Sequence, residues 1–204
     1  MSLPQTLPVF TSEEYLALER ASEIRHECLD GSVYAMAGES PEHSTICFNL
    51  AVVIGLQLRD KPCRGFSPNM KVRTNDSGLY AYPDLMVVCG EPRFHDERRD
   101  VVVNPTVIFE VLSPSTEAFD RGEKFLRYRT QIATLTDYLL VSQTKPLIEH
   151  FSSQPDGTWL YTAVSGLSET LSLASIDCQL PLAEVYSRLN FFIGETTQEG
   201  EMAS

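Results

Sequence analysis

The chain has 204 residues, 43% hydrophobic and 22% charged, which is ordinary for a globular protein with one core. Its formal net charge of -12 excludes strong nonspecific binding of nucleic acid over the whole surface, because such binding requires Lys and Arg to neutralise phosphates. A local basic cleft, with cations bound among the acidic groups, would still admit a phosphate-bearing substrate.

The sequence shows no signal for export or membrane insertion. Its apolar runs are all shorter than a membrane span, and residues 1–9 lack the basic start and apolar core of a signal peptide. The chain has five scattered cysteines, which are Cys28, Cys47, Cys63, Cys89 and Cys178. Because they form no C-x-x-C pair, we expect free thiols in a reducing cytoplasm rather than a zinc site or a disulfide framework.

The first third of the chain predicts a helix, a hairpin and a longer helix. Thr11 precedes acidic and apolar residues in the pattern of a capped helix. Asp30-Gly31 is a typical hairpin turn between two short strands. Ser40-Pro41-Glu42 predicts a helix start with proline at the first helical position, and the apolar spacing continues to about Leu58.

The middle of the chain predicts strands and one helix. Residues 64–73 and 79–88 read as consecutive strands around a turn at residues 75–78. After a polar loop, residues 105–112 read as a central strand, and residues 117–131 as a helix.

The last third predicts mainly strands. Three of them are expected over residues 138–142, 147–152 and 159–164. A short helix is expected over residues 181–189. This order predicts one mixed α/β (α+β) domain over residues 1–193, followed by a polar, disordered tail over residues 194–204.

Two carboxylates lie in strand-like apolar runs, where burial is costly unless they are paired or bind a metal. Asp84 begins its run and Glu110 lies near the end of its own. If the two strands are antiparallel neighbours, both side chains can point to one face of the sheet. Oxygen ligands suit Mg²⁺, with Mn²⁺ as a substitute, and such an ion serves phosphodiester chemistry. Alternatively, Asp84 is a turn residue and Glu110 is an edge-strand residue, both exposed to solvent.

Several short motifs occur together with these carboxylates between about Tyr15 and Tyr186. They are Glu27-Cys28-Leu29-Asp30-Gly31, Ser40-Pro41-Glu42-His43, Asn69-Met70-Lys71-Val72-Arg73, Pro83-Asp84, Cys89-Gly90-Glu91-Pro92, Ser113-Pro114-Ser115-Thr116 after the Glu110 strand, and Asp120 with Lys124. The combination resembles the Uma-type restriction endonuclease family, also classified as a domain of unknown function, in the PD-(D/E)XK nuclease superfamily.

The resemblance implies a restriction-endonuclease-like core, in which helices flank a central mixed sheet. It also implies Mg²⁺-dependent endonuclease activity on phosphodiester bonds, with DNA as the expected substrate and Asp84 and Glu110 as metal ligands. Restriction-type nucleases commonly form homodimers. We therefore expect nucleic acid and a second copy of the chain as partners, and no membrane.

One position departs from the superfamily pattern, which places a lysine two residues after the glutamate, where this chain has Leu112. Such a lysine positions the attacking water and offsets phosphate charge. Two lysines could replace it, Lys124 on the following helix and Lys71 on the strand before Asp84. The resemblance favours Lys124.

The helix that carries Lys124 allows two interpretations. Asp120, Lys124 and Tyr128 are four residues apart and share one face, which could complete the site. Alternatively they form a solvated stripe with an ordinary ion pair, because Phe125 and Ile132 mark the core face elsewhere on the helix.

Two further residues are secondary candidates. An early acidic residue can complete the metal shell in related nucleases, and Glu27 next to the hairpin turn would be that residue. His43, in the first turn of its helix, could bind metal or contact phosphate, although a lone histidine there is more often a surface or capping residue.

Three functions remain open from the sequence. The first is the metal-dependent endonuclease, in which Lys124 orients water. The second is a catalytically inactive nuclease-like binding or assembly module, which Leu112 and the net charge of -12 would explain. The third is a metal-dependent hydrolase of a smaller phosphoester, which an acidic surface would tolerate better.

Overall fold

Helix α1 (Ser12–Ala21) and the first hairpin form as their local signals predict. The Thr11 side chain accepts a hydrogen bond from the Glu14 backbone N–H at 3.2 Å, and Glu14 reaches back to the Thr11 backbone N–H at 2.8 Å. Strands β1 (His26–Leu29) and β2 (Ser32–Ala35) are joined by Asp30 and Gly31, both at positive φ. The computed structural model describes residues 9–75 and 78–191.

Helix α2 (Pro41–Gln57) begins at the predicted proline. Its N-cap, Ser40, accepts a hydrogen bond from the His43 backbone N–H at 3.1 Å. Ile46, Leu50 and Ile54 are fully buried along one face at helical spacing, so this face packs onto the sheet.

The long hairpin predicted over residues 64–88 is instead divided between two sheets. Strand β3 (Cys63–Phe66) pairs with β6 (Leu85–Cys89), and β4 (Lys71–Arg73) pairs with β5 (Leu79–Ala81). The turn at residues 67–70 divides the first predicted strand into β3 and β4, and the segment Tyr82–Asp84 divides the second into β5 and β6. As a result, β3 and β6 belong to one sheet and β4 and β5 to the other. Part of the predicted 75–78 turn lies outside the described residues.

The main sheet has six strands in the order β11-β10-β9-β8-β6-β3. The predicted central strand is β8 (Val107–Leu112), which is parallel to β9 (Asp137–Ser142) and antiparallel to β6. Strands β10 (Leu147–Ser153) and β11 (Trp159–Ser165) extend the sheet as a hairpin. The second sheet has the order β2-β1-β5-β4-β7, where β7 is Val101–Val102.

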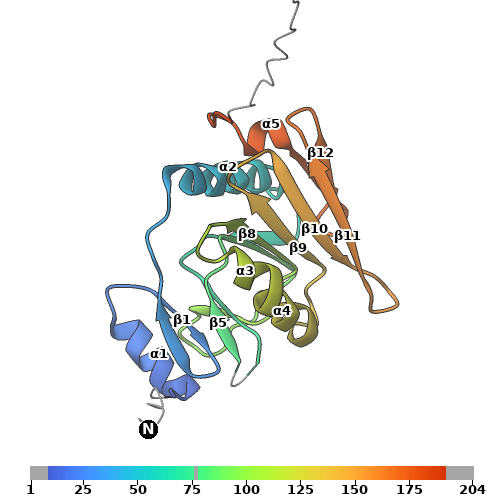
Figure 1. Cartoon of the computed structure of the whole chain (residues 1–204). Coiled ribbons are helices and arrows are strands. Elements are labelled where there is room, and N and C mark those ends of the chain that lie inside the picture. Colours follow the sequence, from blue (N-terminus) through green and yellow to red (C-terminus); the bar gives the residue numbers. More distant parts are fainter. Residues whose placement is uncertain (1–8, 76–77, 192–204) are drawn as a thin grey trace, which may run out of the picture.

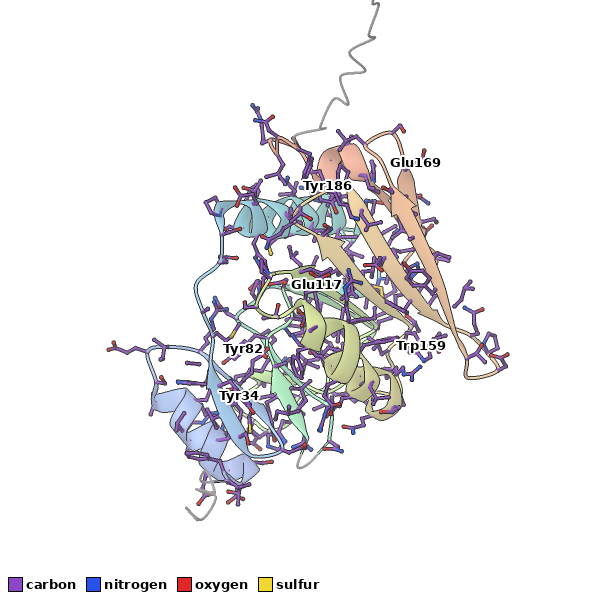
Figure 2. All side chains as sticks on the ribbon, in the orientation of Figure 1. Tyr34, Tyr82, Glu117, Trp159, Glu169 and Tyr186 are labelled. Atoms are coloured by element: carbon purple, nitrogen blue, oxygen red, sulfur yellow. A yellow bond between two sulfur atoms is a disulfide. The ribbon has the colours of Figure 1, made fainter. Side chains whose placement is uncertain are left out.

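Helices cover the two faces of the main sheet (Figure 1). Alternate residues of β8 face opposite ways: Phe109 packs in the core under α2, and Ile108 packs in the core under the helical segment after β8. Trp159, labelled in Figure 2, packs edge-on against Phe125 of that segment, with ring centroids 5.4 Å apart. The predicted mixed sheet flanked by helices is confirmed.

The helical segment after β8 contains an irregularity that the sequence pattern did not indicate. It comprises α3 (Glu117–Phe119), the π-helical turn η1 (Asp120–Lys124) and α4 (Phe125–Gln131). A π-turn inserts one extra residue into the helical repeat, so the residues that follow it point in other directions than they would in a regular α-helix. The segment still covers the predicted range of residues 117–131.

The C-terminal part differs from the prediction. Strands β12 (Thr170–Leu173) and β13 (Cys178–Pro181) form an antiparallel pair, which was not predicted. The helix expected over residues 181–189 is only the short α5 (Leu182–Val185). The predicted tail over residues 194–204 lies outside the described residues. Among the helices described, none has the length and apolarity needed to cross a membrane.

The prediction that all cysteines are free thiols was wrong. Cys63 and Cys89 lie directly opposite each other in the β3–β6 pair and form a disulfide. The sequence could not show this, because the strand pairing that aligns the two residues spans 26 positions. Cys28, Cys47 and Cys178 are free.

Candidate active site

Asp84 and Glu110 lie side by side at one end of the β6–β8 pair. Leu85 pairs with Phe109 in an antiparallel register, so the next pair outward joins Asp84 to Glu110. The Asp84 carboxylate accepts a hydrogen bond from the Val111 backbone N–H at 2.7 Å, which fixes its position against β8. The predicted antiparallel arrangement of the two strands is therefore present.

Lys124 reaches Glu110 from the helical segment. Its Nζ lies 3.0 Å from Glu110 Oε1, and both side chains are almost fully buried. Leu112, at the usual lysine position, is buried in the core under α4. An ammonium group therefore does lie beside the glutamate, but it comes from η1 instead of from β8.

Asp120 and Tyr128 complete the surroundings of this ion pair. Asp120 Oδ1 lies 3.2 Å from Lys124 Nζ, and the Tyr128 hydroxyl lies 3.5 Å from Glu110 Oε1. All three residues of the predicted helix face are buried, so the solvated-stripe alternative is wrong. Asp120 and Lys124 both lie on the π-turn and are buried, and the adjacent Phe125 also packs in the core.

Glu27 connects the site to the second sheet. From β1, its Oε1 accepts a hydrogen bond from the Tyr82 backbone N–H at 3.1 Å and lies 3.6 Å from Lys124 Nζ. Tyr82, labelled in Figure 2, belongs to the segment that leads from β5 to Asp84. The cluster therefore forms where the two sheets meet.

His43 contacts Asp84 from the first turn of α2. Its Nε2 lies 3.4 Å from Asp84 Oδ2, and its Nδ1 lies 2.9 Å from Glu39 Oε2. Burial acts to lower the pKa of His43, but the contacts with Asp84 and Glu39 outweigh it and raise the pKa to about 9. The expectation of a surface or capping side chain is wrong, because the His43 side chain is only 12% exposed.

Two neighbours of His43 were missed at the sequence level. Glu39 and Cys47 lie four residues on either side of it, and the Cys47 sulfur is 3.5 Å from His43 Nδ1. This i, i+4, i+8 spacing aligns His43 and Cys47 on one face of α2 with Glu39, which precedes the N-cap of the helix. The spacing could have been noticed, although the chemistry of Cys47 is not visible without its surroundings.

Lys71 lies in a different environment. Its Nζ is 3.2 Å from Asp100 Oδ2 and donates to the Tyr82 hydroxyl at 3.3 Å. Of the two lysines proposed as substitutes, it is Lys124 that contacts Glu110.

Burial and mutual charge set the electrostatics of the cluster. Burial raises the pKa of Glu110 well above its ordinary value, although Lys124 acts in the opposite direction. Burial also disfavours the ammonium of Lys124, but Glu110, Glu27 and Asp120 outweigh it and raise its pKa. Asp84, Glu110 and Glu27 each contribute a carboxylate, the ligand type that Mg²⁺ prefers, but in the described part of the chain their oxygens do not all lie within 4.8 Å of one another.

The fold, a mixed six-stranded sheet flanked by helices, has a counterpart among solved structures. A solved structure titled as a putative nuclease belonging to DUF820, from Anabaena variabilis, superposes with a TM-score of 0.71. It is 16% identical, and the match covers 87% of this chain and 98% of that one.

Sequence comparison places the chain more narrowly. Residues 12–183 match the family model Uma2, described as "Putative restriction endonuclease", and the chain belongs to this family. Two proteins of Synechocystis sp. (strain ATCC 27184 / PCC 6803 / Kazusa), sll1609 and slr1290, are each 36% identical to it. The matches cover 81% and 90% of this chain, and 93% and 95% of the two relatives; both are described as uncharacterized.

Proposed function

We propose that the protein is a metal-dependent endonuclease that hydrolyses phosphodiester bonds of DNA. The observation that carries the proposal is the contact between Lys124 Nζ and Glu110 Oε1 at 3.0 Å. Lys124 thereby lies beside the carboxylate pair, although Leu112 occupies the position two residues after Glu110 where the superfamily pattern has its lysine. Membership of a family described as restriction endonucleases supports the same reaction class.

Asp84 and Glu110 would hold Mg²⁺, with Glu27 assisting directly or through a water. The ion supplies Lewis-acid polarisation of the phosphoryl oxygen and lowers the pKa of a bound water. Asp84 is suited to this position because the Val111 N–H occupies one of its oxygens and fixes the carboxylate. Five carboxylates, those of Glu27, Glu39, Asp84, Glu110 and Asp120, surround the Lys124 and His43 cations, so a divalent cation would neutralise excess negative charge.

Lys124 would orient the attacking water and stabilise charge that develops on the phosphate. An ammonium group has three donors, and here they face the carboxylates of Glu110, Asp120 and Glu27. If Glu110 held a metal, one Lys124 donor would be free for water, while Asp120 and Glu27 would keep the side chain in place. Asp120 and Glu27 therefore position Lys124.

The test is cleavage of plasmid and linear DNA by the purified protein with Mg²⁺ or Mn²⁺. Asp84→Asn keeps an oxygen for the Val111 N–H but removes the charge, so the fold persists and cleavage falls. Asp84→Asn, or Glu110→Gln, which likewise removes a carboxylate charge, should lower the rate of cleavage at least ~10²-fold. Unchanged cleavage by Asp84→Asn would contradict the proposal.

Lys124→Gln and Lys71→Gln form a matched pair, because both lysines are buried and paired with carboxylates. We expect Lys124→Gln to reduce the rate about 10²- to 10³-fold and Lys71→Gln to change it only a few-fold. Circular dichroism of each variant verifies folding. The opposite pattern would assign the role to Lys71. A folded wild-type protein that cleaves neither DNA nor RNA would favour the non-catalytic module, and hydrolysis confined to nucleotides would favour a smaller phosphoester.

A further inference from the structure

Beside the proposed Mg²⁺ site lies a second group of side chains with different donor chemistry. Glu39 Oε2, His43 Nδ1 and Cys47 Sγ all lie within 4.8 Å of one another. Glu39 precedes the N-cap of α2, and the other two follow at successive turns of the helix. The nuclease proposal does not use Glu39 or Cys47.

We infer that Glu39, His43 and Cys47 form a binding site for a borderline-soft divalent cation of the Zn²⁺ class. One carboxylate oxygen, one imidazole nitrogen and one thiolate sulfur are the ligands that Zn²⁺ and Co²⁺ prefer, whereas Mg²⁺ selects oxygen alone. The absence of C-x-x-C pairs led us to expect no zinc site. A site with a single cysteine contains no such pair, so cysteine spacing could not reveal it.

The sulfur–nitrogen distance fits a tetrahedral ion, and the oxygen–nitrogen distance is shorter than such an ion requires. Bonds of the length that zinc makes to oxygen, nitrogen and sulfur put the ligands about 3.3–3.7 Å apart. Cys47 Sγ lies 3.5 Å from His43 Nδ1, and Glu39 Oε2 lies 2.9 Å from the same nitrogen. Glu39 is exposed and can adjust, while His43 and Cys47 are partly buried on the helix.

Asp84 orients the histidine of this site. Because Nδ1 faces Glu39 and Cys47, the other ring nitrogen, Nε2, is left to face Asp84 Oδ2 at 3.4 Å. Metal-bound histidines commonly donate their second N–H to a carboxylate, which fixes the ring and strengthens the ligand. Asp84 is thus a positioning residue here, and it joins this site to the proposed Mg²⁺ site. Three protein ligands leave a fourth position for water or substrate.

The test is a titration of the wild-type protein with Co²⁺, followed by absorption spectroscopy without added reductant, so that the Cys63–Cys89 disulfide stays intact. A thiolate bound to Co²⁺ gives a near-ultraviolet charge-transfer band. We expect one equivalent of Co²⁺ to produce this band and Zn²⁺ to abolish it by displacement. Absence of the band in the wild-type protein would overturn the inference, whatever the variants do.

Variants assign the band to its residues. Cys47→Ser should abolish it, whereas Cys178→Ser, which alters another free cysteine, should retain it. Asp84→Asn should keep the band and weaken Co²⁺ binding about 10- to 100-fold. A band that survives in Cys47→Ser, or disappears in Cys178→Ser, would overturn the assignment. The readout of this test is absorbance and not DNA cleavage. A wild-type protein that shows the Co²⁺ band but cleaves no DNA would contradict the nuclease proposal and leave this inference standing.

Discussion

Lys124 is a buried lysine held by carboxylates from three different elements. Glu110 comes from β8, Asp120 from η1 and Glu27 from β1. Burying such a group is costly, and the cost is recovered only when its partners are close and hydrogen-bonded. Because the cost of removing these charges from water offsets most of their mutual attraction, the cluster is a weak source of net stability, and a role in function explains it better.

A second ion pair at the residue scale has a different role. Asp100 accepts two hydrogen bonds from Arg20 and lies 3.2 Å from Lys71, which attaches α1 to the loop before β7. The hydrogen bonds from Arg20 contribute most to lowering the pKa of Asp100, which falls to about 2.

Because the Asp100 pKa is lower in the folded protein than in the unfolded chain, the pair stabilises the fold fully above about pH 4. That contribution is lost as the pH falls towards 2. Asp100→Asn should lower the free energy of unfolding by about 1 kcal/mol at pH 6 and by little at pH 2.5, measured by urea denaturation. Asp177→Asn, at a side chain that is 94% exposed, is the control. An equal loss at both pH values would contradict the argument.

Some candidate residues could be recognised from the sequence alone, whereas the contacts of others depend on the fold. Asp84 and Glu110 were recognisable because carboxylates in apolar runs need a partner. Lys124 and Glu27 were suggested by family resemblance, but only the fold shows that both reach the same cluster. Whether Lys124 or Lys71 lies beside Glu110 depends on long-range packing, which residue spacing does not encode.

At the scale of elements, the first hairpin turn holds the chain preceding α1. Gly31 has a φ of 81°, and a Cβ there would lie 2.7 Å from the Phe10 carbonyl oxygen and would overlap Val9 Cγ1. The Phe10 backbone N–H donates to the Gly31 carbonyl at 2.9 Å, so the two segments cannot separate without losing this bond.

Gly31→Ala should therefore cost more than backbone strain alone. Gly157, in the β10–β11 turn, has a φ of 82°, and a Cβ added there would meet nothing within 4 Å, so Gly157→Ala measures the strain. We expect Gly157→Ala to destabilise by about 1–2 kcal/mol. Gly31→Ala should destabilise by at least about 1 kcal/mol more, in urea denaturation, because overpacking adds to the strain. Equal losses would show that the contact with Phe10 relaxes freely.

Elements with strong local signals were predictable, and those set by tertiary pairing were not. The Thr11 cap, the Asp30-Gly31 turn and the Ser40 cap each form as expected, because a few neighbouring residues determine them. The division of residues 63–89 between two sheets was not foreseen, since each half looks like a continuous strand. The π-turn and the pairing of β12 with β13 likewise leave little trace in hydrophobic periodicity.

At the scale of the whole molecule, the site lies where the two sheets and the helical segment meet (Figure 1). The net charge of -12 opposes the approach of nucleic acid, so the proposed substrate would have to be held locally, and the proposed metal ions would offset the carboxylates. The second proposed cation site, at the N-terminal end of α2, is joined to the first through His43 and Asp84.

The most direct test of the nuclease site is a crystal of the protein soaked in Mn²⁺, with anomalous diffraction measured. We predict an anomalous peak bounded by the carboxylates of Asp84 and Glu110, with Lys124 as the nearest lysine. A peak confined to Glu39 and His43, or a bound ion whose nearest lysine is Lys71, would contradict it.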